Sequence, residues 1–206
     1  MSKLQNVTKR YFYLFPKEPN VDRLRLLITD ESIYSISKPR DAEKIIKLIK
    51  HVYKKDIFNA TITDGTANVG GDTIHFSKHF NKVNSVELNP LHCKALENNL
   101  RVYKRKNVNI ICNNYLNALL TLRQNIIYLD PPWGGPKYSE SEKVQLYLGD
   151  YDLSEVIKKI RLKAELIVIK APYNYDYKRL FKRIGKCRKK GYIIRNKIMV
   201  LLISYV

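Results

Sequence analysis

The chain has 206 residues, 45% of them hydrophobic, and its 38 Lys and Arg residues against 19 Asp and Glu give a formal charge of +19. This length suits one α/β domain with a proper core. We see neither a membrane-spanning apolar run nor a secretory signal, so we expect an intracellular protein of cytoplasm or nucleus. The charge favours nucleic acid as the partner over a membrane surface; the alternative is a composition bias of an A/T-rich genome.

Cysteine and histidine usage predicts neither disulfides nor a metal site. Cys93, Cys112 and Cys187 are odd in number and form no CxxC pattern, so we expect three reduced thiols. His75 and His79 share one helix face, but no further ligand lies nearby in the sequence. We expect a monomer, working alone or within a larger assembly. The composition and length also fit a virus, which would place the chain in host cytoplasm or virion.

Strand-like and helix-like patterns alternate along the chain. Strands are expected at 57–63, 83–87, 108–113, 125–130 and 165–170, and helices at 41–53, 72–80, 90–103, 115–123, 153–161 and 175–185. Residues 191–206 predict a terminal hairpin joined through Asn196 and Lys197. This order predicts an α/β fold: a Rossmann-like, mostly parallel seven-stranded sheet with a C-terminal antiparallel hairpin. We expect a single domain, 1–206, with a short helical extension at 1–40 and the core at 41–206.

The loop after the first expected strand suits a nucleoside cofactor. Ligands of open α/β sheets bind at the carboxyl ends of the strands, and the first such end reads TITDGTANVGGDT (61–73). Gly70 and Gly71 open the next helix, where small residues let a ligand approach backbone N–H groups. Glu87 ends the second strand and can accept from both hydroxyls of a ribose. These features alone leave a dinucleotide and S-adenosylmethionine both open.

The fourth strand runs into IIYLDPPWGGPKY (126–138), which holds the only tryptophan. An exocyclic base amine is a poor nucleophile, and the side chain of Asp130 and the carbonyl of Pro131 can accept its hydrogens and orient it. Trp133 offers a flat face to the base. This loop favours an amino-methyltransferase over a dehydrogenase; the structural alternative is a Pro-rich turn with a buried tryptophan.

The sequence resembles a known family at these motifs. DPPWGGPKY (130–138), with DGTANVGGDT (64–73) upstream, is similar to the catalytic domain of the trimethylguanosine synthase family, cap-specific guanine-N2 methyltransferases. RYFYLF (10–15), DESIYSISKPRDAEKI (30–45), VELNP (86–90) and KAPYN (170–174) follow in family order, so the resemblance covers most of the chain. It implies a class I methyltransferase that transfers methyl from S-adenosylmethionine to N2 of 7-methylguanosine on capped RNA.

The loops and the resemblance together assign the site residues. Cofactor contacts are expected from Asp64, Gly65, Thr66, Asn68, Gly70, Gly71, Thr73, Glu87, Asn114 and Asp130. Catalysis is expected from Asp130, Pro131 and Trp133, with Trp133 stacking on the cationic 7-methylguanine. Substrate contacts are expected from Trp133, Tyr34, Ser35, Lys137, Lys170 and Asn174. The candidates for the cap triphosphate are Lys9, Arg10, Lys38, Arg40, Lys137, Lys170 and Arg179.

Three residues depart from the family pattern. Asn68 stands where the first loop glycine is expected, Asn114 where an acidic residue would accept from the adenine amine, and Asp130 where cellular members commonly carry serine. Asp130 leaves an adenine-N6 DNA or RNA methyltransferase as an alternative, and the two asparagines leave a non-catalytic nucleic-acid-binding subunit. The basic run at 183–195 is either a solvated turn or a contact to RNA phosphates beyond the cap.

Overall fold

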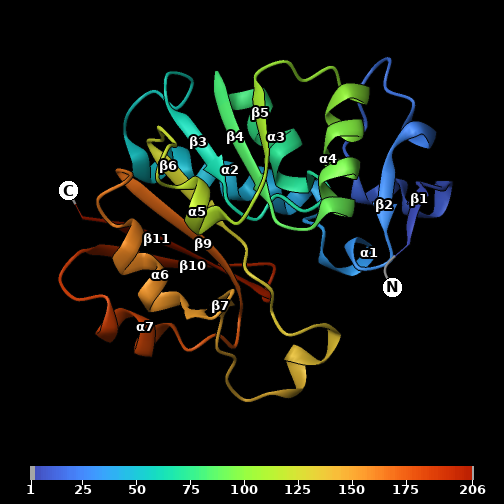
Figure 1. Ribbon diagram of the computed structural model, residues 1–206. Coiled ribbons are helices and arrows are strands. Elements are labelled where there is room, and N and C mark those ends of the chain that lie inside the picture. The colour runs from blue at the N-terminus through green and yellow to red at the C-terminus, as the bar shows by residue number, and fades with distance from the viewer. Residues whose placement is uncertain (1–2, 206) are drawn as a thin grey trace. The chain divides into compact units, whose positions relative to one another are not determined.

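The computed structural model describes residues 3–205, except the side chains of Pro136 and Lys137 (Figure 1). The chain divides into two compact units, residues 1–122 and 123–206, and each is described by itself. Within the described residues, no helix combines the length and apolarity needed to cross a membrane.

The first unit begins with the N-terminal extension. Strand β1 (Leu4–Asn6) pairs antiparallel with β2 (Leu27–Thr29), two 3-10 helices (Lys9–Leu14 and Arg23–Arg25) lie between them, and α1 (Ser32–Ser35) follows. The side chain of Asn99 accepts from the N–H of Leu27 at 2.7 Å and donates to its carbonyl at 2.9 Å. The extension is therefore only partly helical, and its second strand is fastened to the core.

Three parallel strands in the order β3-β4-β5 form the sheet of the first unit. Its elements are α2 (Pro39–Tyr53), β3 (Thr61–Asp64), α3 (Gly71–His79), β4 (Lys82–Glu87), α4 (Pro90–Val102), β5 (Val108–Cys112) and α5 (Tyr115–Ala118). Helix α2 buries Ala42, Ile45, Ile46 and Ile49, one face at helical spacing. Pro39 occupies its first turn, which suits a residue with no N–H to donate.

Two expected elements of this unit are shorter than the sequence pattern indicates. Strand β3 begins at Thr61 because the N–H of Ala60 donates to the carbonyl of Ile57 at 3.1 Å and closes a turn first. Helix α5 ends at Ala118, where the N–H of Thr121 donates three residues back at 3.1 Å. The apolar residues that suggested longer elements lie in the turns before β3 and after α5. Turn residues can also be apolar when they pack against a core.

The second unit supplies four strands in the order β6-β9-β11-β10. Its elements are β6 (Ile126–Leu129), a 3-10 helix (Pro136–Glu140), β7 (Tyr147–Leu148), β8 (Tyr151–Asp152), α6 (Leu153–Ile160), β9 (Leu166–Pro172), α7 (Tyr177–Arg183), β10 (Arg188–Ile194) and β11 (Ile198–Ser204). β6 and β9 are parallel, whereas β11 runs antiparallel to β9 and β10. Arg195 and Asn196 have φ of 55° and 56°, so the predicted hairpin turn is confirmed.

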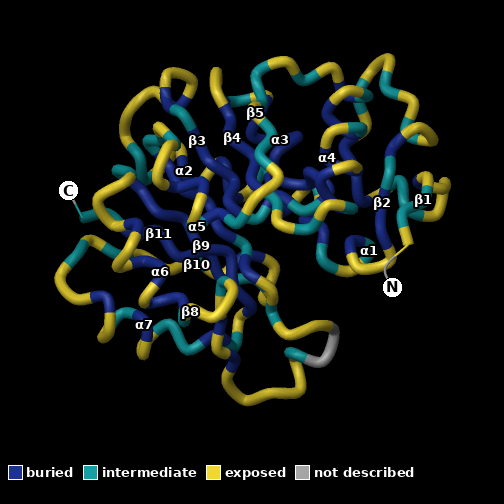
Figure 2. The backbone as a smooth tube through the Cα atoms, in the orientation of Figure 1, coloured by how far each residue is buried: buried dark blue, intermediate teal, exposed yellow. Residues whose placement is uncertain are grey.

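The predicted fold class is confirmed: the seven strands make a mostly parallel sheet with a C-terminal antiparallel hairpin. Every residue of β6 and β9 is buried, and Figure 2 shows β9 as a dark blue tube. Strands buried on both faces leave their carboxyl ends for polar chemistry. The candidate site residues lie at the ends of β3, β4 and β5 in the first unit and of β6 and β9 in the second.

The cysteine prediction is wrong for two of the three residues. Cys93 on α4 and Cys112 at the end of β5 form a disulfide, with Cα atoms 6.0 Å apart, whereas Cys187 is free. Helix α4 packs against β5, which brings the two Cα atoms within the range that a disulfide bridges. Their separation of 19 residues gives no sign of this contact.

Candidate functional site

The loop after β3 is built around a buried carboxylate. Asp64 is 1% exposed; its Oδ2 accepts from Thr73 Oγ1 at 2.8 Å, and its Oδ1 accepts from the N–H of Thr66 at 3.3 Å. Thr73 Oγ1 also lies 2.8 Å from Ser85 Oγ on β4. Asp64 and Thr73 are predicted cofactor contacts. In the structure, their hydrogen bonds fix the conformation of the loop. Gly65, also buried, lies in the turn that they fix.

Neighbouring side chains of the protein occupy the space next to the two loop glycines. Gly70 has φ of 98°, and a Cβ there would lie 2.9 Å from Leu96 Cδ1. A Cβ on Gly71 would lie 2.6 Å from Ile36 Cγ1. The expected reason for these glycines, approach of a ligand, is therefore joined by a structural one: the helix and the extension pack directly on the loop.

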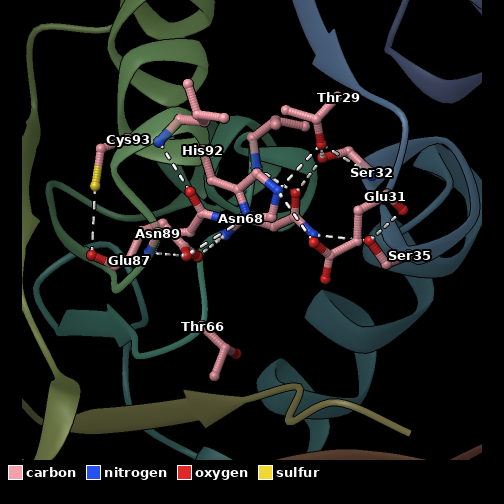
Figure 3. Close-up of polar contacts among 12 residues, drawn as sticks. Thr29, Glu31, Ser32, Ser35, Thr66, Asn68, Glu87, Asn89, His92 and Cys93 are labelled. Atoms are coloured by element: carbon pink, nitrogen blue, oxygen red, sulfur yellow. Dashed lines mark hydrogen bonds and ion pairs between the residues drawn. The ribbon is translucent and has the colours of Figure 1, made fainter. Parts of the chain in front are cut away.

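Asn68 ties the same loop to α1, as Figure 3 shows. Its φ is 51°, a left-handed conformation that asparagine tolerates well. Its Oδ1 accepts from Ser32 Oγ at 2.7 Å and from the N–H of Val69 at 2.7 Å, and its Nδ2 donates to Ser35 Oγ at 2.9 Å. A glycine at this position would keep the turn and lose the side-chain link.

Glu87, at the end of β4, is held by backbone donors on both oxygens. Oε2 accepts from the N–H of Asn68 at 2.7 Å, and Oε1 accepts from the N–H of Asn89 at 2.8 Å, with His92 Nδ1 3.6 Å from Oε1 (Figure 3). Burial alone would raise the pKa of Glu87, but the interactions with His92 and the two N–H groups outweigh it and lower the pKa. The carboxylate is therefore ionised and fixed in direction.

His92 completes this network, and sequence reasoning missed it. The ring is buried, and its Nε2 lies 3.1 Å from Thr29 Oγ1, which lies 2.7 Å from Ser32 Oγ. A chain of polar contacts thus runs from Glu87 through His92, Thr29 and Ser32 to Asn68. The only signal in the sequence was a histidine in the first turn of a helix, soon after the Glu87 strand end.

The remaining predicted contacts of the first unit are less embedded. Asn114 caps α5, with its Oδ1 accepting from the N–H of Leu116 at 2.9 Å. That oxygen retains a second lone pair for an adenine amine. Tyr34 on α1 is 60% exposed, and the Ser35 hydroxyl donates to the carbonyl of Glu31 at 2.9 Å. Thr66, in the loop, is half-buried.

The loop after β6 is anchored by an ion pair. Asp130 Oδ1 accepts from Trp133 Nε1 at 3.0 Å, and its Oδ2 accepts from Lys170 Nζ on β9 at 2.6 Å. Lys170 is 4% exposed, and its ammonium lies 5.3 Å from the centre of the Trp133 ring. Pro131, which follows Asp130 in the chain, is buried. The structure thus joins the predicted amine acceptor and the predicted base platform directly.

Lys170 has a different place from the one expected. As a predicted ligand of the cap it would need to reach an exposed phosphate, yet its ammonium is buried against Asp130. Every residue of β9 is buried, so this strand places Lys170 in the interior of the unit. A buried ammonium requires a charged partner. The Asp130 carboxylate is this partner, with its Oδ2 2.6 Å from the Lys170 ammonium.

The chain beyond Trp133 is open. Gly134 and Gly135 have φ of 90° and 81°, and a Cβ on either would meet no atom of the described residues within 4 Å. Tyr138 packs edge-on against the Trp133 ring with centroids 5.1 Å apart. The positive φ values favour glycine at both positions.

Asn174, a predicted substrate contact, fastens this open loop. Its Nδ2 donates to the carbonyls of Tyr138 at 3.0 Å and Ser141 at 2.7 Å. Its Oδ1 is buried with no hydrogen-bond partner among the described residues. The Lys137 side chain lies outside the described part. Four other candidates for the triphosphate in the first unit and one in the second are exposed: Lys9, Arg10, Lys38, Arg40 and Arg179.

The two helical histidines contact a carboxylate. His75 Nδ1 lies 2.8 Å from Glu43 Oε1, and His79 Nε2 lies 3.5 Å from its Oε2. Burial lowers the pKa of His75, and the hydrogen bond to Glu43 opposes that shift without cancelling it. Within residues 3–205 no group of three or more His, Cys, Asp or Glu side chains is placed to hold a metal ion.

Known proteins resemble this chain in sequence and in fold. Residues 59–203 match the protein family described as RNA cap guanine-N2 methyltransferase. An uncharacterized protein of Acanthamoeba polyphaga mimivirus is 27% identical over 216 residues, covering 93% of this chain and 84% of the relative. The trimethylguanosine synthase of Schizosaccharomyces pombe is 27% identical over 171 residues, covering 79% and 69%. The structure of a precorrin-6y C5,15-methyltransferase from Geobacter metallireducens aligns with a TM-score of 0.60 at 14% identity, covering 84% and 92%, and so shares the fold.

Proposed function

Because the chain belongs to the RNA cap guanine-N2 methyltransferase family, we propose that it transfers a methyl group from S-adenosylmethionine to N2 of the 7-methylguanosine cap of RNA. The observation that carries the proposal is the unit formed by Asp130, Trp133 and Lys170. It combines a fixed hydrogen-bond acceptor for an amine with a flat aromatic face beside open glycines.

The polar groups of the first unit fit the nucleoside part of S-adenosylmethionine. Glu87 Oε1 is shared by the N–H of Asn89 and the His92 ring, whereas Oε2 accepts one N–H and keeps a lone pair that suits a ribose hydroxyl. Its lowered pKa keeps both oxygens acceptors at neutral pH. Asn114 offers an amide oxygen to an adenine amine. When bound, S-adenosylmethionine supplies an electrophilic methyl group.

Asp130 and Pro131 act on the acceptor. The lone pair of guanine N2 is conjugated with the ring, so the amine needs acceptors that orient it. Lys170 and Trp133 each donate to one oxygen of the Asp130 carboxylate, which fixes its orientation. As N2 gains the methyl group it becomes positive and acidic, and the nearby carboxylate stabilises that charge. No covalent enzyme intermediate is required.

Trp133 selects the methylated cap. A 7-methylguanine ring carries a positive charge, and stacking on indole adds a cation–π attraction of about 1–2 kcal/mol. The ammonium of Lys170 lies near the same ring, and Asp130 Oδ2, 2.6 Å from that ammonium, offsets part of its repulsion of a cationic base. The flat face and the adjacent open glycines therefore favour a planar cation.

The test is methyl transfer from labelled S-adenosylmethionine to three RNAs: one with a 7-methylguanosine cap, one with an unmethylated guanosine cap and one without a cap. We expect N2-methylguanosine, identified by mass spectrometry of nucleosides, from the first RNA alone. Methyl on internal adenines would support the adenine-N6 alternative. No transfer, together with no thermal shift at S-adenosylhomocysteine concentrations where about 2.7 kcal/mol is expected for 100 times Kd, would support a non-catalytic subunit.

A further inference from the structure

The network around Glu87 contains a buried histidine that the proposed chemistry does not use. His92 is 5% exposed; its Nδ1 lies 3.6 Å from Glu87 Oε1, and its Nε2 lies 3.1 Å from Thr29 Oγ1 (Figure 3). The hydrogens of this ring follow from the contacts around it, because each donor group has a fixed number of protons. The direction of each hydrogen bond can be assigned in turn, starting from a backbone N–H.

Asn68 is the starting point of this assignment. The N–H of Val69 donates to Asn68 Oδ1 at 2.7 Å, which identifies that atom as the amide oxygen. Ser32 Oγ lies 2.7 Å from the same oxygen and donates its proton to it. A hydroxyl has one proton, so Ser32 Oγ only accepts in its other contacts.

The direction at Thr29 follows from that of Ser32. Thr29 Oγ1 lies 2.7 Å from Ser32 Oγ, which accepts there, so the Thr29 hydroxyl donates its proton to Ser32. With that proton used, Thr29 Oγ1 accepts from the ring at 3.1 Å, and His92 Nε2 therefore carries a hydrogen. Thr29 is the last residue of β2, so the N-terminal extension sets the orientation of the His92 ring.

The orientation of this ring decides what the Glu87 carboxylate contacts. With Nε2 held by Thr29, Nδ1 faces Glu87 Oε1, which also accepts the N–H of Asn89 at 2.8 Å. Burial raises the pKa of Glu87, and the interaction with His92 is the largest effect that opposes burial. His92 therefore engages Oε1 and leaves Oε2, which accepts the N–H of Asn68, as the oxygen for a ribose hydroxyl.

Two carboxylates flank the His92 ring. Besides Glu87, Glu31 has its Oε2 3.7 Å from His92 Nε2, and the Glu31 side chain is 50% exposed. Among the described residues, no other charged side chain lies at ion-pair distance from His92 or from Glu87. His92 is thus the side chain through which the fold acts on the charge and direction of Glu87.

We propose that His92 is a positioning residue for the cofactor: held by Thr29 through its Nε2–H, it fixes the Glu87 carboxylate in the orientation that accepts the ribose of S-adenosylmethionine. The inference rests on the proposed function for the identity of the cofactor. Thr29 and His92 do not contact the cofactor in this proposal, and both act only through Glu87. The alternative is a buried histidine that stabilises the fold and has no effect on the cofactor.

The test measures affinity for S-adenosylhomocysteine by titration calorimetry in Thr29→Val, Thr29→Ser and His92→Gln. Thr29→Val removes the hydroxyl that accepts from Nε2 at nearly constant side-chain size, whereas Thr29→Ser keeps this hydroxyl. His51→Gln, an exposed histidine of α2, is the control. Each affinity is measured at about pH 8 and about pH 5, and kcat and KM for S-adenosylmethionine are measured at the higher pH.

We expect Thr29→Val and His92→Gln to bind S-adenosylhomocysteine about tenfold more weakly, which corresponds to about one lost hydrogen bond to a charged group. Thr29→Ser and the control should bind as the wild type does. In His92→Gln nothing replaces the effect of the ring on Glu87, so the pKa of Glu87 rises and affinity falls further at the lower pH. KM for S-adenosylmethionine should rise in parallel, with kcat unchanged.

Unchanged affinity in Thr29→Val and His92→Gln, or a loss in His92→Gln with the pH dependence of the wild type, would overturn the inference. If a variant does not fold, the wild type decides: the magnetic resonance spectrum of isotope-labelled histidine nitrogens should show hydrogen on His92 Nε2, and a ring protonated on Nδ1 alone would refute the proposal. Wild-type protein without affinity for S-adenosylhomocysteine would refute the proposed function, whereas the ring spectrum would still test the contact with Thr29.

Discussion

The loops after β3 and after β6 hold their functional side chains in different ways. In the first unit, Asn68 and Glu87 belong to a chain of polar contacts that reaches α1 through His92 and Thr29. In the second unit, one ion pair with Lys170 fixes the acceptor, and the chain beyond Trp133 passes into open glycines.

The difference follows what each loop is proposed to bind. A cofactor has the same shape in every turnover, so a loop that folding has already fixed binds it with little further loss of entropy. A capped RNA brings a constant base on a variable chain, which suits a rigid acceptor beside a rim without side chains. The comparison predicts different effects of substitutions in the two loops. In the first loop they should lower affinity for the cofactor, and in the second they should lower protein stability or selectivity for the base.

The largest expected effect tests the anchor of the second loop. Lys170→Met leaves the Asp130 carboxylate, 15% exposed, without its cation. Breaking a buried pair costs about 3 kcal/mol, which corresponds to a fall in Tm of about 6–12 °C for a chain of this size. Calorimetry checks it against Lys163→Met, an exposed lysine of the same unit. A fall no larger than that of the control would mean that the pair does not anchor the loop.

The next effect tests the first loop. Glu87→Gln removes the charge that two N–H groups and the proposed ribose hydroxyls share. Hydrogen bonds to charged groups contribute about 1.5–3 kcal/mol each, so we expect affinity for S-adenosylhomocysteine to fall about 100-fold in titration calorimetry. Glu97→Gln on the exposed side of α4 should leave affinity unchanged. A loss below fivefold would show that the carboxylate does not contact the cofactor.

The strands that precede both loops can be predicted from the sequence. Buried strands such as Ile126–Leu129 appear as short apolar runs, and their carboxyl ends carry Glu87 and Asp130 because a parallel sheet places polar groups there. The hairpin turn at Asn196 follows from one residue type that accepts positive φ between two β-rich runs. Local chemistry and strand order decide these features.

The side-chain contacts between distant segments cannot be predicted from the sequence. Ser35 and Asn68 are 33 residues apart, Asp130 and Lys170 are 40 apart, and neither pair has a periodic relation. The sequence therefore suggested that Lys170 contacts phosphate, because the depth at which β9 carries it depends on the packing of whole strands. The Cys93–Cys112 pair escaped for the same reason.

A smaller effect tests base selectivity of the second loop. Trp133→Leu removes the aromatic face, so the preference for 7-methyl-GTP over GTP should shrink by about 5–30-fold, the equivalent of about 1–2 kcal/mol of cation–π attraction. Because Trp133 is the only tryptophan, its fluorescence also reports binding directly in the wild type. Tyr147→Leu, an exposed aromatic in the same unit, is the control. Selectivity that survives in Trp133→Leu would place the base elsewhere.

Restoring the family glycine tests the latch between the first loop and α1. Asn68→Gly loses the bonds to Ser32 and Ser35, about 1 kcal/mol each, but relieves the positive φ, so the net destabilisation should be about 1 kcal/mol. Amide exchange at Ser32–Ser35 should accelerate several-fold. Asn20→Gly is a matched control, because Asn20 also has a positive φ of 61°. Equal exchange at α1 in both variants would show that Asn68 does not hold this helix.

The smallest effect concerns pH and separates the Glu87 network from an ordinary exposed carboxylate. Hydrogen bonds lower the pKa of Glu87 below its usual 4.5, so the group stabilises the folded loop above that value and loses this contribution as pH falls through the folded pKa. Affinity for S-adenosylhomocysteine should therefore be constant between pH 8 and about pH 5, where the carboxylate remains ionised. Titration calorimetry at three pH values in this range checks it. A steady decline across the range would mean that burial dominates the hydrogen bonds, and that the first loop is less fixed than its geometry indicates.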